Sequence, residues 1–136
     1  MAEIVSMGEL LIDFTPVGET EDGRLLFARN PGGAPANVAV QAYRAGVSAG
    51  FLGRVGKDMF GDFLVGTLKD CGVDISGLSQ DPDYATTLAF VQLSPEGDRD
   101  FSFYRNPGAD TRLSFEDTDL SLIDQCKLLC FGSLLM

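Results

Sequence analysis

Two adjacent glycines and a nearby asparagine form the pattern in this chain that is best suited to bind a small polar ligand. Gly32 and Gly33 stand just before a segment with helical spacing, and Asn37 falls in its first turn. Glycine lets the backbone approach a ligand closely, and a helix start offers unpaired N–H groups at the positive end of the helix dipole. The pattern indicates a site for an oxygen-rich molecule, and a tight turn before an ordinary helix is the plain alternative.

The familiar nucleotide motifs and the usual nucleophiles are missing from the sequence. It has neither Gly-x-Gly-x-x-Gly after a first strand nor the Gly-Lys-Ser/Thr ending of a phosphate-binding loop. It has no histidine, and its three cysteines show no Cys-x-x-Cys spacing. These absences argue against a dehydrogenase, a zinc site and a Ser-His or Cys-His nucleophile. Any acid–base chemistry would have to come from a carboxylate.

The composition and net charge argue against several classes of binding partner. Of the 136 residues, 45% are hydrophobic, which is enough for one domain-sized core. The formal net charge of −10 disfavours a nucleic-acid-binding surface and docking on an anionic membrane. The first residues have no basic region of a signal peptide, and no apolar run approaches the roughly 18 residues of a membrane span. We therefore expect a cytoplasmic protein with no nucleic-acid or membrane partner.

The elements around the glycine pair alternate as in an α/β fold. An apolar first strand is expected to end at Asp13, where a carboxylate needs a partner or a ligand. Pro35 and Gly46 mark the two ends of a helix. Asp58 and Gly72 do the same for a second helix. The expected elements are a strand over 4–14, a loop with a short strand or hairpin arm over 17–29, a helix over 35–45, a strand over 47–55 and a helix over 58–71.

Residues after 84 change to the period of two that is typical of strands. Two β-rich runs separated by a turn cluster predict an antiparallel hairpin inserted into the α/β order. Alternation puts Phe101, Phe103 and Arg105 on one face of this hairpin. Tyr104 falls on the other face. The two strands are expected over 87–93 and 100–104.

The last ten residues, 127–136, form a near-continuous apolar run after a predicted short helix over 121–125. Such a run is typical of a central parallel strand, which needs cover on both faces. Nothing in the sequence follows to provide that cover. We therefore expect residues 1–136 to be the N-terminal portion of a longer protein.

The glycines and the asparagine also stand at the spacing of a known signature. Because of this spacing, the chain resembles the ribokinase-like, or phosphofructokinase B type, carbohydrate kinases. The matching positions are Gly32, Gly33, Asn37, Ala39, Gly46 and Gly56, with the segment 53–61. Within the family the chain is most similar to fructokinases, on the segments 8–14, 29–37, 86–91, 101–106 and 131–133. The resemblance covers nearly the whole chain, and only 111–113 departs, being less apolar than is usual in fructokinases.

The resemblance implies the N-terminal part of a ribokinase-like three-layer α/β/α fold with a small β-sheet lid. The lid strands are expected within about 15–30 and 84–106, and such strands often join two subunits into a homodimer. The implied reaction is ATP-dependent phosphorylation of a sugar with Mg²⁺, above all of fructose to fructose 6-phosphate. In the family, the catalytic Asp of a Gly-Ala-Gly-Asp motif and the nucleotide pocket lie in a C-terminal half. No such motif occurs here, so we expect no catalytic residue and no metal ligand in this chain.

The resemblance carries substrate-binding roles onto matching positions: Asp13, Gly32, Gly33, Asn37, Phe103 and Arg105. It implies that Asp13 and Asn37 exchange hydrogen bonds with sugar hydroxyls while the glycine pair brings backbone amides near the ring. It also implies that Phe103 packs against the sugar and that Arg105 lies near it. Plain structural roles stay open, with Asp13 paired at a strand end and Asn37 bonded to nearby backbone.

Two other functions also stay open. One is a kinase of the same fold for a related acceptor, either 2-keto-3-deoxygluconate or a nucleoside. The other is a non-catalytic, truncated module that binds sugar or dimerises, which the abrupt apolar end of the sequence favours. The lid residues, rather than the glycine pair, would distinguish the acceptors.

Overall fold

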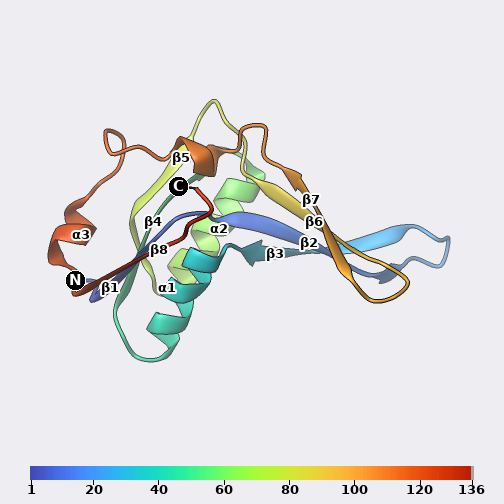
Figure 1. The fold of residues 1–136 in the computed structure, drawn as a ribbon, viewed down its shortest axis with the longest axis horizontal. Coiled ribbons are helices and arrows are strands. Elements are labelled where there is room, and N and C mark those ends of the chain that lie inside the picture. The colour runs from blue at the N-terminus through green and yellow to red at the C-terminus, as the bar shows by residue number, and fades with distance from the viewer. Residues whose placement is uncertain (136) are drawn as a thin grey trace.

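The computed structural model describes residues 1–135, which form two four-stranded β-sheets (Figure 1). The parallel sheet has the order β5 (Asp74–Asp81), β4 (Ala49–Gly56), β1 (Ile4–Met7) and β8 (Leu128–Phe131). The second sheet, called the projecting sheet below, has the order β3 (Leu25–Gly32), β2 (Leu11–Glu19), β6 (Leu88–Leu93) and β7 (Arg99–Tyr104). The helices are α1 (Ala34–Arg44), α2 (Met59–Asp70), α3 (Ser121–Gln125) and a short 3-10 helix, η1 (Ala109–Arg112). The helices cover the parallel sheet, and α2 also contacts the base of the projecting sheet.

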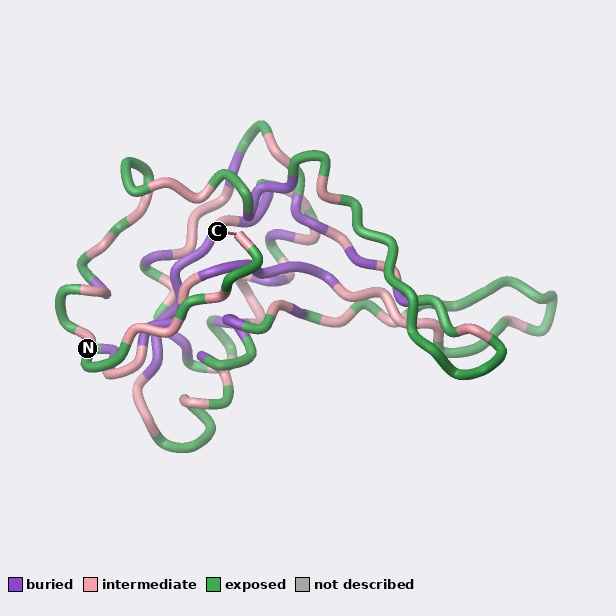
Figure 2. Tube along the Cα trace, in the orientation of Figure 1, coloured by how far each residue is buried: buried purple, intermediate pink, exposed green. Residues whose placement is uncertain are grey.

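Helices cover both faces of the parallel sheet. The neighbours Phe51 and Leu52 on β4 point to opposite faces, because side chains alternate along a strand. Phe51 belongs to a buried cluster with residues of α1 and α2. Leu52 packs with Leu122 of α3 in a second cluster. This arrangement is the three-layer α/β/α order that the family resemblance implies. Most buried residues lie in these layers, whereas the outer part of the projecting sheet is exposed (Figure 2).

The predicted single strand over 4–14 is wrong, because the chain changes sheets within it. β1 ends one residue before Gly8, and β2 begins three residues after Gly8 in the projecting sheet. Gly8 has a φ of 150°, a backbone conformation that residues with a side chain rarely adopt. β2 then continues to Glu19, so Asp13 lies inside a strand and not at the end of one.

The two long helices and the strand between them confirm the prediction. α1, β4 and α2 begin and end close to their expected bounds. Asp58 caps α2, accepting a hydrogen bond of 2.8 Å from the backbone N–H of Gly61. No strand is predicted from the sequence at β5, because most residues of this segment are polar. It is an edge strand that pairs only with β4 among the described residues, which explains how it tolerates that composition.

The projecting sheet consists of two antiparallel hairpins, β2–β3 and β6–β7, which are joined by parallel pairing of β2 with β6. The hairpin predicted after residue 87 is present as β6 and β7. The loop predicted from Val17 is wrong, because β2 runs through this position to Glu19. A short turn then leads into β3, which is longer than the expected arm.

β8 lies at an edge of the parallel sheet, whereas the run 127–136 predicts a central strand. It is a short strand that pairs only with β1 within residues 1–135. Leu128 and Phe131, its end residues, are 52% and 58% exposed. The apolar composition of this strand is therefore not matched by burial in this chain.

A buried ion pair fixes the turn that leads from β5 towards the projecting sheet. Arg54 on β4 donates through Nε to Asp81 at the end of β5 over 2.8 Å, and both side chains are largely buried. Asp81 also accepts hydrogen bonds from the backbone N–H groups of Asp83 and Tyr84. Burial raises the pKa of Asp81, but these hydrogen bonds and the Arg54 charge outweigh it and hold the pKa below its ordinary value.

Replacing Asp81 with Asn should destabilise the fold by about 3 kcal/mol near neutral pH, because it leaves the largely buried Arg54 with only the exposed carboxylate of Asp117, 3.8 Å away, as a counter-charge. The pKa of Asp81 is lowered by folding, so its contribution is complete above about pH 4 and is lost as the pH falls through the folded value. Urea unfolding of both proteins at about pH 7 and about pH 3 measures this difference. Asp22→Asn, at the exposed pair with Arg24, is the control and should change nothing. A loss of equal size at both pH values would contradict the prediction.

Candidate functional site

The glycine pair lies where β3 meets α1. Gly32 is the last residue of β3, and Gly33, with a φ of 110°, is the N-cap of α1. A side chain at Gly32 would collide with the carboxylate of Asp13. One at Gly33 would collide with the carbonyl oxygen of Glu9. Close packing against β2 and the turn before it therefore requires both glycines, independently of any ligand.

Cross-strand pairing places Asp13 and Phe103 on one face of the projecting sheet. Asp13 on β2 is opposite Ala89 on β6, and Ala89 is opposite Phe103 on β7. Residues opposite one another in a sheet point to the same face. The Ala89 side chain between them is small and fully buried.

Burial determines the electrostatics of Asp13. The residue is half-buried, and desolvation is the cause that raises its pKa above the ordinary value. A carboxylate that has lost part of its hydration costs free energy unless hydrogen bonds replace that hydration. Hydroxyl groups of a ligand would supply such hydrogen bonds.

Arg105 is held by a buried carboxylate. Its Nη2 donates to Asp110 Oδ2 over 2.8 Å, while Thr87 Oγ1 donates to Asp110 Oδ1 over 2.7 Å. The Asp110 side chain is fully buried, and that of Arg105 is 19% exposed. The Arg105 guanidinium lies 5.9 Å from the centre of the Phe103 ring. Its Nε is buried and makes no hydrogen bond within the described residues, so donor capacity remains.

The predicted alternation along β7 is confirmed by the aromatic contacts. The rings of Phe101 and Phe103 stack with their centres 5.9 Å apart. Tyr104 instead packs edge-on against Phe90, with centres 5.5 Å apart. Phe103 therefore shares the Asp13 face, and Tyr104 lies on the opposite face. Arg105, the first residue after β7, lies on the Phe103 side because its guanidinium is near that ring.

Asn37 borders a different hollow. It is exposed in the first turn of α1, and its backbone N–H donates to the carbonyl oxygen of Gly33 over 3.0 Å. It lines a hollow between α1 and α2 together with Gly32 and Thr67. Asp13, Phe103 and Arg105 do not line that hollow.

Sequence reasoning did not single out two buried carboxylates near these residues. One is Asp110, whose position in a Pro-Gly-Ala-Asp turn gives no sign of its pairing with Arg105. The other is Glu9, in the turn between β1 and β2, which is 5% exposed. Its Oε2 has no hydrogen-bond partner among residues 1–135, and a side chain at Gly132 would approach it to 3.1 Å.

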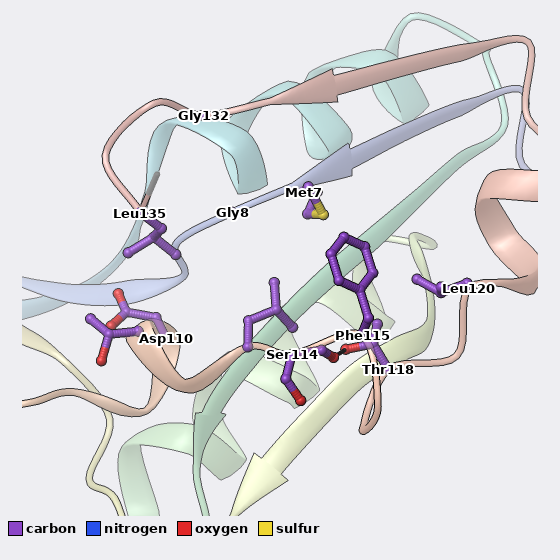
Figure 3. Close-up of a pocket in the computed structure, with 11 residues that line it drawn as sticks. Met7, Gly8, Asp110, Ser114, Phe115, Thr118, Leu120, Gly132 and Leu135 are labelled. Carbon is purple, nitrogen blue, oxygen red and sulfur yellow. Dashed lines mark hydrogen bonds between the residues drawn. The ribbon is translucent and has the colours of Figure 1, made fainter.

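Asp110 also borders a cavity of about 220 Å³ at the carboxyl ends of β1 and β8 (Figure 3). Gly8 and Gly132 line it beside the turn that links the two sheets. The remaining wall is mostly apolar and includes Met7, Leu113, Phe115, Leu120 and Leu135. The cavity thus connects the Gly8 turn with the Arg105–Asp110 pair.

The described part of the chain contains no cluster of three or more His, Cys, Asp or Glu side chains that could hold a metal ion. Across residues 1–135, no helix has both the length and the apolar character needed to cross a membrane.

Comparison with known proteins identifies relatives over the whole sequence. The family model described as pfkB family carbohydrate kinase matches residues 1–136. The chain is 47% identical to a probable chloroplastic fructokinase-6 of Arabidopsis thaliana and 46% identical to a fructokinase of Solanum tuberosum. These matches cover 96% of this chain but 35% and 42% of the two relatives. The chain therefore spans less than half the length of these curated relatives.

Solved structures share the fold. A fructokinase of Xylella fastidiosa has a TM-score of 0.89 at 36% identity, covering 96% of this chain and 41% of that one. A sugar kinase of Pyrococcus horikoshii in complex with ATP has a TM-score of 0.87 at 38% identity, covering 97% of this chain and 43% of the other. Because the family model matches the entire sequence and these structures reproduce both sheets, the chain belongs to the pfkB family of carbohydrate kinases.

Proposed function

We propose that the protein is an ATP-dependent sugar kinase that converts fructose to fructose 6-phosphate. The observation that carries this proposal is the sheet face on which Asp13, Phe103 and Arg105 lie, next to the glycine pair. A hydrogen-bond acceptor, an aromatic ring and a planar set of donors suit a polyhydroxy ligand. Membership of the family supports the reaction class, and the names of the relatives support the sugar.

In this proposal the chain supplies the sugar-binding half of the enzyme. Asp13 accepts hydrogen bonds from sugar hydroxyls, and Arg105 donates to them through its guanidinium. Phe103 packs against the apolar C–H groups of the sugar. The glycine pair lets the backbone approach the ring. Asn37 lines the separate hollow between α1 and α2, so its hydrogen bonds with the sugar stay a prediction. Phosphoryl transfer depends mainly on such positioning and on charge stabilisation.

We assign ATP, Mg²⁺ and the catalytic base to the part of the relatives that this chain does not span. ATP would supply the transferred γ-phosphoryl group. Residues 1–135 offer no cluster of metal-ligating side chains, so no residue here is assigned to Mg²⁺. A cytoplasmic location belongs to the same proposal, although one relative is named as chloroplastic.

We further propose that the projecting sheet closes over the sugar as a lid and joins two copies of the protein. Closure would exclude water and limit hydrolysis of the nucleotide. The outer part of the sheet exposes large apolar side chains, including Leu25 and Leu93, which are 55% and 54% exposed. They border a broad hollow with Phe27 and Phe90. Exposed apolar area of this kind favours a protein contact.

Three other functions could use the same face. A kinase for 2-keto-3-deoxygluconate would use Arg105 as a cation for the carboxylate of that acceptor. A nucleoside kinase would stack its base on the exposed Phe103 ring. A non-catalytic sugar-binding module would bind the sugar on the Asp13 and Phe103 face without turnover.

The central test compares the complete gene product that contains residues 1–136 with the 136-residue chain alone. ADP release is measured with ATP and each acceptor: fructose, 2-keto-3-deoxygluconate and adenosine. Calorimetric titration measures binding of the same acceptors. We expect turnover with fructose from the complete product, and fructose binding without turnover from the chain alone. Absence of fructose turnover and binding in both proteins would exclude the proposed function.

Asp13→Asn should weaken fructose binding by about 10- to 100-fold, the effect of losing a hydrogen bond to a charged group. Binding by the unchanged protein should weaken as the pH falls through the raised pKa of Asp13, and the variant should lose this dependence. Because the pKa of Asp13 is raised in the folded protein, ionisation of this carboxyl destabilises the fold as the pH rises through that pKa. The Asp13→Asn variant carries no such charge, so it should be at least as stable as the unchanged protein near neutral pH. Calorimetry and urea unfolding measure both effects. A variant that loses stability and affinity together would show a structural role instead.

Leu25→Asp should weaken self-association of the complete gene product by at least about tenfold, because a carboxylate in an apolar contact is poorly solvated. Sedimentation equilibrium over a range of concentrations measures the dissociation constant. Tyr43→Asp is the matched control, since Tyr43 is 45% exposed near the C-terminal end of α1, a helix that packs on β1 and β4 of the parallel sheet. Equal association of the two variants would exclude this face as the dimer contact.

A further inference from the structure

The ion pair between Arg105 and Asp110 changes what Arg105 can recognise. The two side chains are in direct contact at 2.8 Å, and the Asp110 carboxylate is fully buried. Opposite charges at this distance largely cancel at the position of a ligand beyond them. Arg105 therefore faces the candidate site as a set of N–H donors with little net positive charge.

Asp110 is held so that it keeps this position. Its second oxygen accepts the hydrogen bond from Thr87, which directly precedes β6. The backbone N–H of Ala109 donates to the carbonyl oxygen of Ala85 over 2.8 Å, which attaches η1 to the same segment. Both oxygens of Asp110 are thus occupied, and it stays beside Arg105 without any ligand.

The ionisable group in the same row as Phe103 is an acid, whereas Arg99 on this face lies at the opposite end of β7 from Arg105. Asp13 lies in the same row of the sheet as Phe103, whose ring is close to Arg105. The charges of Asp13, Arg105 and Asp110 sum to about −1, because one cation meets two carboxylates. A ligand carboxylate on this face would be repelled, whereas hydroxyl groups could still use Asp13 as acceptor and Arg105 as donor.

We propose that Asp110 is a specificity-determining residue that selects an uncharged sugar against a sugar acid, by neutralising Arg105 while leaving its N–H donors available. This inference rests on the proposed function, because it assumes that the sugar lies on the Asp13 and Phe103 face. Without Asp110, the free guanidinium would bind a carboxylate through a charge-assisted, bidentate contact. Asp110 does not touch the sugar and acts through Arg105.

The test measures binding of fructose and of 2-keto-3-deoxygluconate to the complete gene product by calorimetry. Asp110→Asn keeps the shape of the side chain and a hydrogen-bonding oxygen for Thr87 but removes the charge. We expect affinity for 2-keto-3-deoxygluconate to rise relative to fructose by at least about tenfold, a difference of about 1.4 kcal/mol. Because salt screens charges, this increase in relative affinity for 2-keto-3-deoxygluconate should become smaller at higher ionic strength. If the affinities for fructose and 2-keto-3-deoxygluconate fall by the same factor in Asp110→Asn, their ratio is unchanged. That result would overturn the inference and leave Asp110 with a purely structural role.

Two further variants keep the test decisive. Thr87→Val loosens Asp110 without changing any charge, so it should leave the ratio of the two affinities unchanged. Arg105→Gln combined with Asp110→Asn replaces the ion pair by a neutral pair and should fold even if Asp110→Asn does not. In this double variant, the affinity for 2-keto-3-deoxygluconate relative to fructose should stay within about threefold of its value in the unchanged protein, a difference of about 0.7 kcal/mol. A selective loss of 2-keto-3-deoxygluconate binding in this double variant would show that Arg105 acts as a cation and would overturn the inference.

The outcomes also separate this inference from the proposed function. Fructose turnover with an unchanged ratio in Asp110→Asn would leave the kinase proposal standing and remove only the role of Asp110. Failure of the unchanged protein to bind fructose would remove both.

Discussion

Two adjacent threonines attach the projecting sheet to the rest of the molecule, because each is bonded to an aspartate from a different element. Thr86 donates through its backbone N–H and its hydroxyl to Asp58, the N-cap of α2, over 2.9 and 2.7 Å. Thr87 donates to Asp110 beside η1, and its carbonyl oxygen accepts from the backbone N–H of Ile12 on β2. α2, β2 and η1 therefore meet at the first residues of the β6–β7 hairpin. The position of Arg105 depends on this junction.

Aromatic contacts anchor the base of the projecting sheet to α2, whereas its outer part is exposed. Phe14 on β2 packs edge-on against Phe60 of α2 with ring centres 5.8 Å apart. Arg29 on β3 lies over the Phe63 ring of the same helix, 3.8 Å from its centre. The tips of the hairpins have no such contact with the helices and are exposed (Figure 2). A sheet that is anchored at its base and free beyond it suits the lid we propose.

Three carboxylates of the chain differ in whether hydrogen bonds compensate their burial. Burial raises the pKa of Asp58, but hydrogen bonds from Thr86 and Gly61 outweigh it and lower the pKa below the ordinary value. Asp81 behaves in the same way beside Arg54. Asp13 has burial without such compensation, and its pKa is raised. Compensated carboxylates stabilise the fold, whereas an uncompensated one stores free energy that a ligand can release.

Local patterns in the amino-acid sequence predict the two long helices, the strand between them, the hairpin and the resemblance to the family. Short-range signals such as Pro35, Gly46 and the Asp58 cap act within one or two turns, so they are readable in a linear pattern. The break at Gly8 and the formation of strand β5 depend on which strands become neighbours. The pairing of Asp110 with Arg105 and Thr87 depends on the same arrangement. These features are visible only in the folded chain, because contacts between distant residues form when the whole chain packs, and no local pattern encodes them.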